Sequence, residues 1–322
     1  MGFFFLLSGY FTTASYNRKG VRNFLVDKVL RLLVPIIFYE VVIAPLLSMF
    51  IWTQFYKLNL GFAEMYRIYF GDYEFVRNHL WFLVLLFAFN LLYVFFRLVV
   101  PRLGRVLSEK PTKRTDVFTT KKTVIMITSI ALGLGLVHFL VRMGAPVGYW
   151  IPVFGQLGYL PQYALMFILG NVAYLTNAFE RLPKKFSLLC FIPSLIMYAI
   201  YAAVYATRYE LIGEFLGGAT GFSFFFSMGE MIFGTLYGLA ILVLFREFVN
   251  IQPGKFGKWI IDAAYATYIL HPVPVVMLAV WILTIKIRFI AKFFLECALS
   301  LIASWILGIL FKAIPGVNKK IL

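Results

Sequence analysis

The sequence predicts an all-α polytopic helix bundle that spans a membrane. Hydrophobic residues make up 62% of the 322 positions and charged residues only 14%, whereas a soluble domain carries about 25% charged residues. Aromatic residues reach 19%, which is typical of lipid-facing surfaces and of the aromatic belts at membrane interfaces. The apolar residues are gathered in runs, with the charged residues between them, as expected of repeated membrane crossings.

Nine apolar segments are predicted to form this bundle. They are residues 2–15, 29–51, 79–98, 124–141, 158–176, 187–206, 222–245, 259–284 and 289–311. All but the first are long enough to cross a hydrocarbon layer of about 30 Å, which takes about 20 helical residues. No stretch between the segments is long enough to fold separately, so residues 1–322 are predicted to form one integral membrane domain.

A basic stretch, here called the basic arm (residues 16–34), follows the first segment and runs into the start of the second. The apolar residues of VRNFLVDKVLRLLV, residues 21–34, share one helical face, which indicates an amphipathic helix at the membrane surface. Asp27 and Arg31 are spaced as an i,i+4 ion pair. Pro35 follows directly and predicts a break or kink where the arm turns into the second segment.

Lysine and arginine are distributed unevenly over the two sides of this predicted topology. The side that holds the basic arm carries 22 of the 30 basic residues, and the other side carries 8. Basic loops stay cytoplasmic, so this side and the C-terminus are predicted to be cytoplasmic, in a plasma (inner) membrane. The net charge of +16 is therefore attributed to topology and anionic lipid, because a nucleic-acid binder carries its basic residues on a soluble face.

The same topology places the N-terminus outside, at the start of a segment that is short for a membrane span. One further helix upstream would lengthen this segment and bring both ends into the cytoplasm. We therefore expect the chain to be an N-terminal truncation of a protein with ten helices.

His271 is the first candidate for function, because ionisable residues inside membrane segments are costly to bury. It lies near the middle of segment 259–284, where an imidazole could act as a general base, as a proton relay or as a hydrogen-bond partner of a substrate. The alternative is structural. Pro272 and Pro274 leave backbone carbonyls free in this helix, and the imidazole could bond to one of them.

The other two histidines lie near segment ends. His79 opens the third segment beside Trp81, where it could contact a substrate arriving from the outer side or simply anchor the helix at the interface. His138 lies one turn before Arg142, at the outer end of the fourth segment, and is interpreted as interfacial. The three histidines are scattered and show no metal-ligand spacing, so no metal site is predicted.

Five motifs follow one another along nearly the whole chain. They are FFFLLSGYF at 3–11, RLLVP at 31–35, HLWFL at 79–83, LPQYALMFILGNVAY at 160–174 and AYATYILHPVPVV at 264–276. In this order and spacing they resemble the acyltransferase-3 family of integral membrane acyltransferases. The fourth motif is similar to the glucan biosynthesis protein C branch of that family.

The resemblance implies ten core helices. The first of them carries an Arg or Lys and, ten residues later, a His that is taken to be catalytic. This helix would precede Met1, so the resemblance and the topology lead to the same expectation of a truncated chain. Without that helix the chain is expected to insert poorly or to be inactive.

The resemblance also implies a function. Family members move an acyl group of the acetyl or succinyl type from acyl-CoA, a co-substrate rather than a bound cofactor, to a hydroxyl of a carbohydrate or related acceptor, as in polysaccharide O-acetylation. A hydroxyl needs a base and the thioester oxygen needs a hydrogen-bond donor; His271 and His79 are the catalytic candidates. CoA phosphates need cationic partners, and the candidates on the basic arm are Arg31, Arg22 and Lys28. Topology and lipid headgroups are the alternative explanation of these three charges.

Two other functions remain compatible with the sequence. Proline-broken spans with buried acids suit a transporter or export factor for a polysaccharide or lipid-linked glycan, although no internal repeat is visible. A non-catalytic remnant of the family is the third interpretation, because the expected first helix lies outside the 322 residues.

Overall fold

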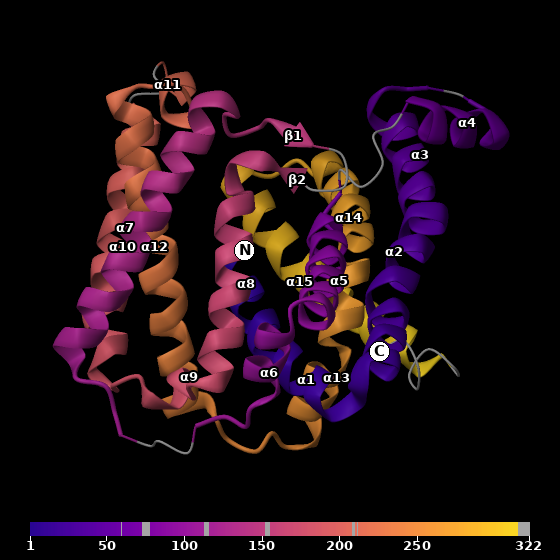
Figure 1. Ribbon diagram of the computed structural model, residues 1–322. Helices are drawn as coiled ribbons and strands as arrows, with labels where there is room; N and C mark the ends of the chain where they lie inside the picture. Colours follow the sequence, from indigo (N-terminus) through magenta and orange to yellow (C-terminus); the bar gives the residue numbers. More distant parts are fainter. Residues whose placement is uncertain are drawn as a thin grey trace. The chain divides into compact units, whose positions relative to one another are not determined.

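The computed structural model is helical apart from one short hairpin (Figure 1). It describes residues 1–58, 60–72, 78–112, 116–151, 155–207, 210 and 212–314. Within these ranges five helices are long and apolar enough to cross a membrane, or six if one bent pair counts as a single span. The predicted class, a polytopic helical membrane protein, is confirmed.

The elements follow one another in a fixed order. The longer helices are α1 (Gly2–Lys28), α3 (Ala44–Phe55), α4 (Phe62–Asp72), α5 (Trp81–Val99), α7 (Thr120–Gly144), α8 (Leu160–Leu175), α10 (Lys185–Thr207), α12 (Gly221–Leu244), α13 (Lys255–Leu270), α14 (Pro272–Thr284) and α15 (Phe289–Ala313). The short helices are α2 (Val34–Phe38), α6 (Pro101–Ser108), α9 (Ala178–Arg181) and α11 (Ile212–Leu216); the 3₁₀ turn is η3 (Leu157–Tyr159) and the π-helical turns are η1 (Val29–Leu33), η2 (Tyr39–Ile43) and η5 (Phe245–Val249). Strands β1 (Trp150–Ile151) and β2 (Gly155–Gln156) pair in antiparallel fashion.

The nine predicted segments all fall on helices, but their lengths differ from the prediction. Helix α8 has 16 residues, which is about 24 Å at 1.5 Å per residue, and the apolar part of α10, Leu189–Val204, is equally short for a span. Segments 2–15 and 29–51 belong to one helical stretch, Gly2–Phe55. Hydropathy finds apolar runs, whereas the length of a helix also depends on how its ends pack.

Glycine interrupts the first helix inside the basic arm. Gly20 has φ 73° and ψ 171°, a conformation that residues with a Cβ rarely adopt. Gly20 therefore places a kink within the basic arm, directly after Arg18 and Lys19.

Two prolines explain the π-helical turns further along the same stretch. Turn η1 directly precedes α2, which carries Pro35 in its first turn, and η2 precedes α3, which carries Pro45. At the end of each π turn a backbone N–H donates to a carbonyl five residues earlier. Since a proline ring cannot donate and crowds the preceding turn, a wider turn accommodates each ring without breaking the helix.

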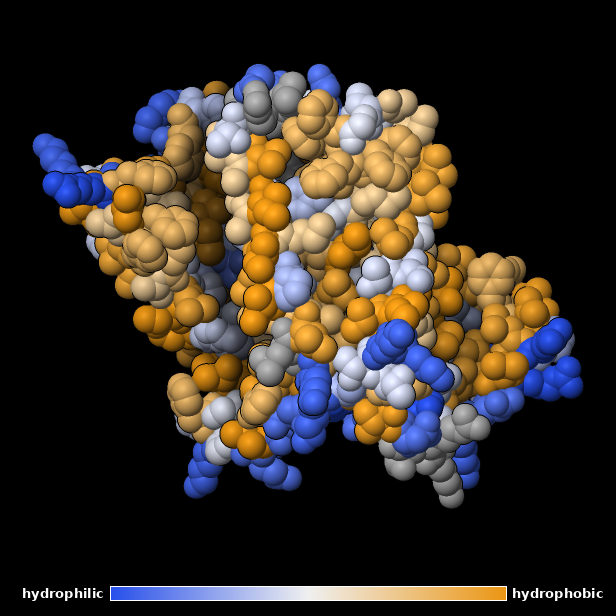
Figure 2. All heavy atoms as spheres, turned by 90° about the vertical axis from the view of Figure 1, so that its left-hand side faces the viewer, coloured by the Kyte–Doolittle hydropathy of each residue, from blue (hydrophilic) through white to orange (hydrophobic). Residues whose placement is uncertain are grey.

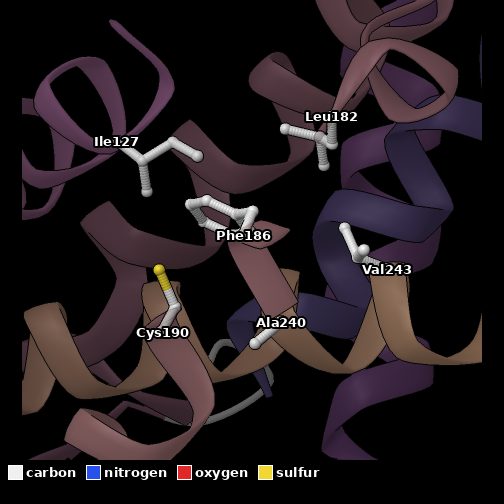
Figure 3. Packing of buried hydrophobic residues seen from close by; sticks show 6 residues of the cluster. All are labelled: Ile127, Leu182, Phe186, Cys190, Ala240 and Val243. Carbon is white, nitrogen blue, oxygen red and sulfur yellow. The ribbon is translucent and has the colours of Figure 1, made fainter. Parts of the chain in front are cut away.

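The chain divides into two compact units, which are described separately. Unit 1 comprises Met1–Leu25 and Ala88–Ile251, and unit 2 comprises Val26–Phe87 and Gln252–Leu322. In unit 1, α7, α10 and α12 pack side by side (Figure 1). Their buried cluster consists of Ile127, Leu182, Phe186, Cys190, Ala240 and Val243, with the Phe186 ring among the others (Figure 3).

The outer side chains of these helices form an apolar surface. Ile125, Leu132 and Leu140 on α7 and Ile192 and Ile196 on α10 are all exposed. Figure 2 shows hydrophobic residues over the middle of this face and hydrophilic residues gathered at its lower end. Such a band with polar borders is what a bilayer requires of the helices that face it.

Candidate functional site

The structure brings the two predicted catalytic histidines into contact within unit 2. His271 lies at the break between α13 and α14, which are bent by 67°, and His79 lies in the turn before α5. Their ring centroids are 4.9 Å apart and the rings are tilted by 74°. Pro272, which cannot donate a hydrogen bond, produces the break that turns the end of α13 toward His79.

Backbone carbonyls orient both imidazoles. His271 Nδ1 lies 2.8 Å from the Tyr268 carbonyl oxygen, and His79 Nε2 lies 3.2 Å from the Ile269 carbonyl oxygen. Because a carbonyl only accepts hydrogen bonds, the nitrogen that faces it carries the proton. This leaves a lone pair on His271 Nε2 and on His79 Nδ1, so each neutral ring can accept a proton or a hydrogen bond.

The imidazole of His271 also bonds to a backbone carbonyl that proline leaves free, as the structural alternative predicted. The Tyr268 carbonyl is four residues before Pro272, so it has no helical N–H partner, and the imidazole takes that place. This contact uses Nδ1 alone. The structural role fixes the ring and leaves the other nitrogen for chemistry.

Aromatic side chains hold His79 from two directions. The Tyr268 hydroxyl donates to the His79 carbonyl at 2.8 Å, and the rings of these two residues are 5.5 Å apart. The Tyr39 ring, almost fully buried, meets the imidazole edge to face at 4.9 Å. These contacts restrict His79 to one orientation.

A buried carboxylate network fixes the backbone around His79. Glu40 is fully buried in the π turn η2 and accepts hydrogen bonds from the Tyr69 hydroxyl, at 3.0 Å, and from the Asn78 side-chain amide. The Asn78 Oδ1 in turn accepts from the Leu80 N–H at 2.8 Å. Asn78 thus links Glu40 to the turn that carries His79. Such π turns occur frequently at functional sites.

The three predicted CoA ligands lie on the basic arm, in two units. In unit 2, Arg31 is exposed and forms the expected pair with Asp27 at 3.1 Å, while its carbonyl accepts from the Tyr265 hydroxyl. Lys28, in the same unit, is half-buried. Arg22 belongs to unit 1 and is exposed on α1. No contact among the described residues assigns any of them to a ligand.

Unit 1 contains a second polar cluster, which the sequence did not predict. Arg142 is fully buried; its guanidinium donates to Glu230 at 2.7 Å and to Ser227 at 3.2 Å. The Tyr159 hydroxyl also donates to Glu230, at 3.0 Å. The interpretation of His138 as interfacial is wrong, because its side chain is completely buried and its ring lies 5.8 Å from that of Tyr159. Residues one helical turn apart share a face, so His138 follows Arg142 into the interior.

Sequence reasoning also missed the residues that orient the histidines. Asn78 and Tyr268 lie within one turn of His79 and His271, so inspecting the neighbours of each histidine could have found them. No such signal marks Tyr69, whose link to the site is purely tertiary. In the described part of the chain, no group of three or more His, Cys, Asp or Glu side chains could hold a metal ion.

Fold and site together define a polytopic membrane protein with two apposed, oriented histidines. The sequence profile of the acyltransferase domain of the acyltransferase-3 family matches residues 1–309. The chain therefore belongs to this family, and the predicted family resemblance is confirmed. No protein of curated function and no solved structure matched the chain. The similarity to the glucan biosynthesis protein C branch stays a prediction.

Proposed function

We propose that the protein is a membrane-bound O-acyltransferase that moves an acyl group of the acetyl or succinyl type from acyl-CoA to a hydroxyl of a carbohydrate or related acceptor. Family membership implies membrane acyltransferase activity. The observation that carries the proposal for this chain is the contact between His79 and His271, each with one nitrogen held by a carbonyl and the other bearing a lone pair.

The chemistry follows from these lone pairs. His271 Nε2 accepts the proton of the acceptor hydroxyl while the hydroxyl oxygen attacks the thioester carbonyl carbon. A C–O bond forms, the C–S bond breaks, and the CoA thiolate leaves and takes up a proton. His79 Nδ1 accepts a hydrogen bond from the acceptor and positions it, which makes the reaction effectively intramolecular.

The donor side of the proposal rests on the basic arm. Arg31, Lys28 and Arg22 are assigned to the CoA phosphates at the cytoplasmic face, because phosphates require cationic partners. The pairing of Arg31 with Asp27 does not oppose this role, since Arg31 is exposed and surface ion pairs contribute only about 0–1 kcal/mol.

The test is acyl transfer by the protein expressed from its complete reading frame and reconstituted into liposomes. Labelled acetyl-CoA and succinyl-CoA serve as donors and a soluble glucan as acceptor. His271→Ala is expected to lower kcat by about 10²–10⁴-fold, the usual contribution of a general base. Cys297→Ala, an exposed position on α15, is the control and should keep wild-type activity.

His271→Asn separates the catalytic role from the structural one. Its amide can still donate to the Tyr268 carbonyl but offers no basic nitrogen in place of Nε2. Low activity with an unchanged melting temperature supports the base. Wild-type activity in His271→Asn would show that His271 only stabilises the helix break.

A transporter or export factor for a polysaccharide or lipid-linked glycan is the second candidate. The buried Arg142–Glu230 pair and the break between α13 and α14 favour it, because transporters bind substrate at broken helices and buried charges. Glycan flux into vesicles without acyl-CoA would support this function. Neither flux nor transfer by the complete reading frame would indicate a non-catalytic remnant of the family.

A further inference from the structure

Unit 1 encloses a cavity of about 480 Å³, within the range of about 300–1,000 Å³ that small-molecule sites occupy. Side chains of α1, α7, α8, α9 and α12 line it. Its walls are mainly apolar, formed by residues such as Leu6, Met126, Ile130, Met166, Leu169 and Leu239. Neither His79 nor His271 belongs to this unit, so the cavity is a different site from the histidine pair.

Two polar side chains in the wall are largely buried. Gln162 is 8% exposed and Thr235 is 7% exposed. The Thr235 hydroxyl has no hydrogen-bond partner among the described residues. Buried polar groups are nearly always paired, so this hydroxyl indicates a bound group that the protein itself does not supply, and the Gln162 amide in the same wall offers a second donor.

Gln162 and Thr235 mark one end of the cavity, because a Cβ on Gly234, next to Thr235, would lie 3.8 Å from Gln162 Nε2. Gln162 comes three residues after Tyr159 on the same helical face, and Gly234, also in the wall, comes one turn after Glu230. Tyr159 and Glu230 belong to the buried Arg142 cluster. The polar end therefore lies next to that cluster, and the apolar walls continue along α12 toward Gly238 and Leu239.

We propose that this cavity binds a fatty acyl chain, with its carbonyl oxygen at the Gln162 amide and Thr235 hydroxyl and its hydrocarbon along the apolar walls. An ester or thioester carbonyl only accepts hydrogen bonds, and both side chains offer donors. Sugars would leave many hydroxyls unpaired against these walls. Met126 and Val172 line the cavity and are both exposed, so the cavity is open to the outside of the unit and a chain can enter it there.

This binding goes beyond the proposed transfer reaction and does not depend on turnover. The acyl chain has two candidate sources: a lipid or fatty acid of the bilayer, or the acyl part of a long-chain acyl-CoA. Both present the same hydrocarbon and, at its head, an oxygen that accepts hydrogen bonds from Gln162 and Thr235. The experiment below measures binding, so it gives the same answer with an inactive protein.

The probe is palmitic acid carrying a photoactivatable diazirine, added to the reconstituted protein from its complete reading frame. The wild type is expected to be labelled on α7, α8 and α12. Gly234→Leu fills the cavity: its Cβ would lie 3.8 Å from Gln162 Nε2, so the side chain fits and occupies the acyl site. We expect at least a tenfold loss of label.

Two further variants control this result. Gly133→Leu adds the same side chain on α7 where nothing lies within 4 Å and outside the cavity, so it should label like the wild type. Thr235→Val keeps the shape and removes one hydrogen bond, which should weaken labelling about fivefold. If Gly234→Leu does not fold, Thr235→Val decides the question.

Competition identifies the source of the chain. Palmitoyl-CoA that displaces the probe better than palmitic acid assigns the site to a long-chain donor, whereas displacement by palmitic acid or phosphatidic acid alone assigns it to a bilayer lipid. Both outcomes support an acyl site. Equal labelling of wild type and Gly234→Leu, or label confined to peptides outside the cavity, would overturn it.

Discussion

Asn78 links the buried Glu40 to the turn that carries His79. Its amide donates to the buried Glu40 and its carbonyl accepts from the Leu80 N–H. In Asn78→Ala the Leu80 N–H loses its side-chain partner and Glu40 keeps the Tyr69 hydroxyl alone of its two donors, and an unpaired buried group costs about 1–3 kcal/mol. We expect a lower melting temperature in detergent and slower acyl transfer.

Asn250→Ala is the matched control, because Asn250 is exposed and surface substitutions change stability by only about ±0.5 kcal/mol. Thermal unfolding and kcat are measured on both variants. An Asn78→Ala protein with wild-type stability and activity would show that the Glu40 network does not position His79.

Glu230 compensates the most deeply buried charge in unit 1. Glu230→Gln leaves the Arg142 guanidinium, which is fully buried, without its carboxylate, and an unpaired buried charge destabilises by about 3–5 kcal/mol. Since the Glu230 side chain is itself 26% exposed, water moderates the loss, and we expect the lower end of that range. Thermal unfolding of the reconstituted protein measures it.

Asp27→Asn, which removes the carboxylate of an exposed ion pair, is the comparison for Glu230→Gln. It breaks the pair with Arg31, whose side chain is 55% exposed, and exposed i,i+4 pairs contribute only about 0.3–0.5 kcal/mol. If both substitutions lower stability equally, the buried pair has no special structural role.

Helices α1 and α8 approach so closely that two glycines are required. A Cβ on Gly170 would lie 2.1 Å from the Leu6 carbonyl oxygen, and a Cβ on Gly9 would lie 2.0 Å from the Phe167 carbonyl oxygen. Gly170→Ala must push the helices apart, and such overpacking costs about 1–3 kcal/mol. Leu6, which Gly170 contacts, also lines the cavity, so probe labelling should fall as well.

Gly133→Ala makes the same chemical change as Gly170→Ala but is expected to raise stability instead of lowering it. Nothing lies within 4 Å of its added Cβ, and alanine favours a helix over glycine by about 1 kcal/mol. Differential scanning fluorimetry should show a lower melting temperature for Gly170→Ala and an equal or higher one for Gly133→Ala. Equal shifts in both would contradict close packing of α1 on α8.

The sequence predicted features that depend on residues close together in the chain, and it missed those that depend on contacts between distant segments. Hydropathy is local, so it located the nine apolar segments but not the helices between them, such as α4 and α6. It could not show that Pro35 and Pro45 widen turns rather than end the helix, because neighbouring contacts decide that choice. Nor could it pair His79 with His271, since the contact joins segments far apart in sequence. The family resemblance made both histidines catalytic candidates, but it did not predict their contact.

The polar cluster around Arg142 in unit 1 gives an example of a wrong prediction with the same cause. A histidine near a predicted helix end is ordinarily interfacial, yet His138 is buried because Arg142, one turn away, finds Glu230 inside the unit. The carboxylate that reverses the prediction lies on another helix. Periodicity within one segment carries no information about it.

The charge distribution predicts the orientation of the whole molecule in the membrane. With 22 of 30 basic residues on one side of the predicted topology, we expect the loops around Lys110 to face the cytoplasm and the loop at Tyr149 to face outward. Both side chains are exposed, so cysteines placed there are accessible to reagents.

The measurement uses a background without native thiols, Cys190→Ala with Cys297→Ala, and a membrane-impermeant maleimide. Tyr149→Cys should react in intact cells, because α7 separates it from the predicted cytoplasmic side. Lys110→Cys should react only after the membrane is opened. The reverse pattern would invert the topology and move the basic arm outside, away from cytoplasmic acyl-CoA. Since Arg31, Lys28 and Arg22 are proposed as CoA ligands, that one result would also remove the donor side of the proposed function.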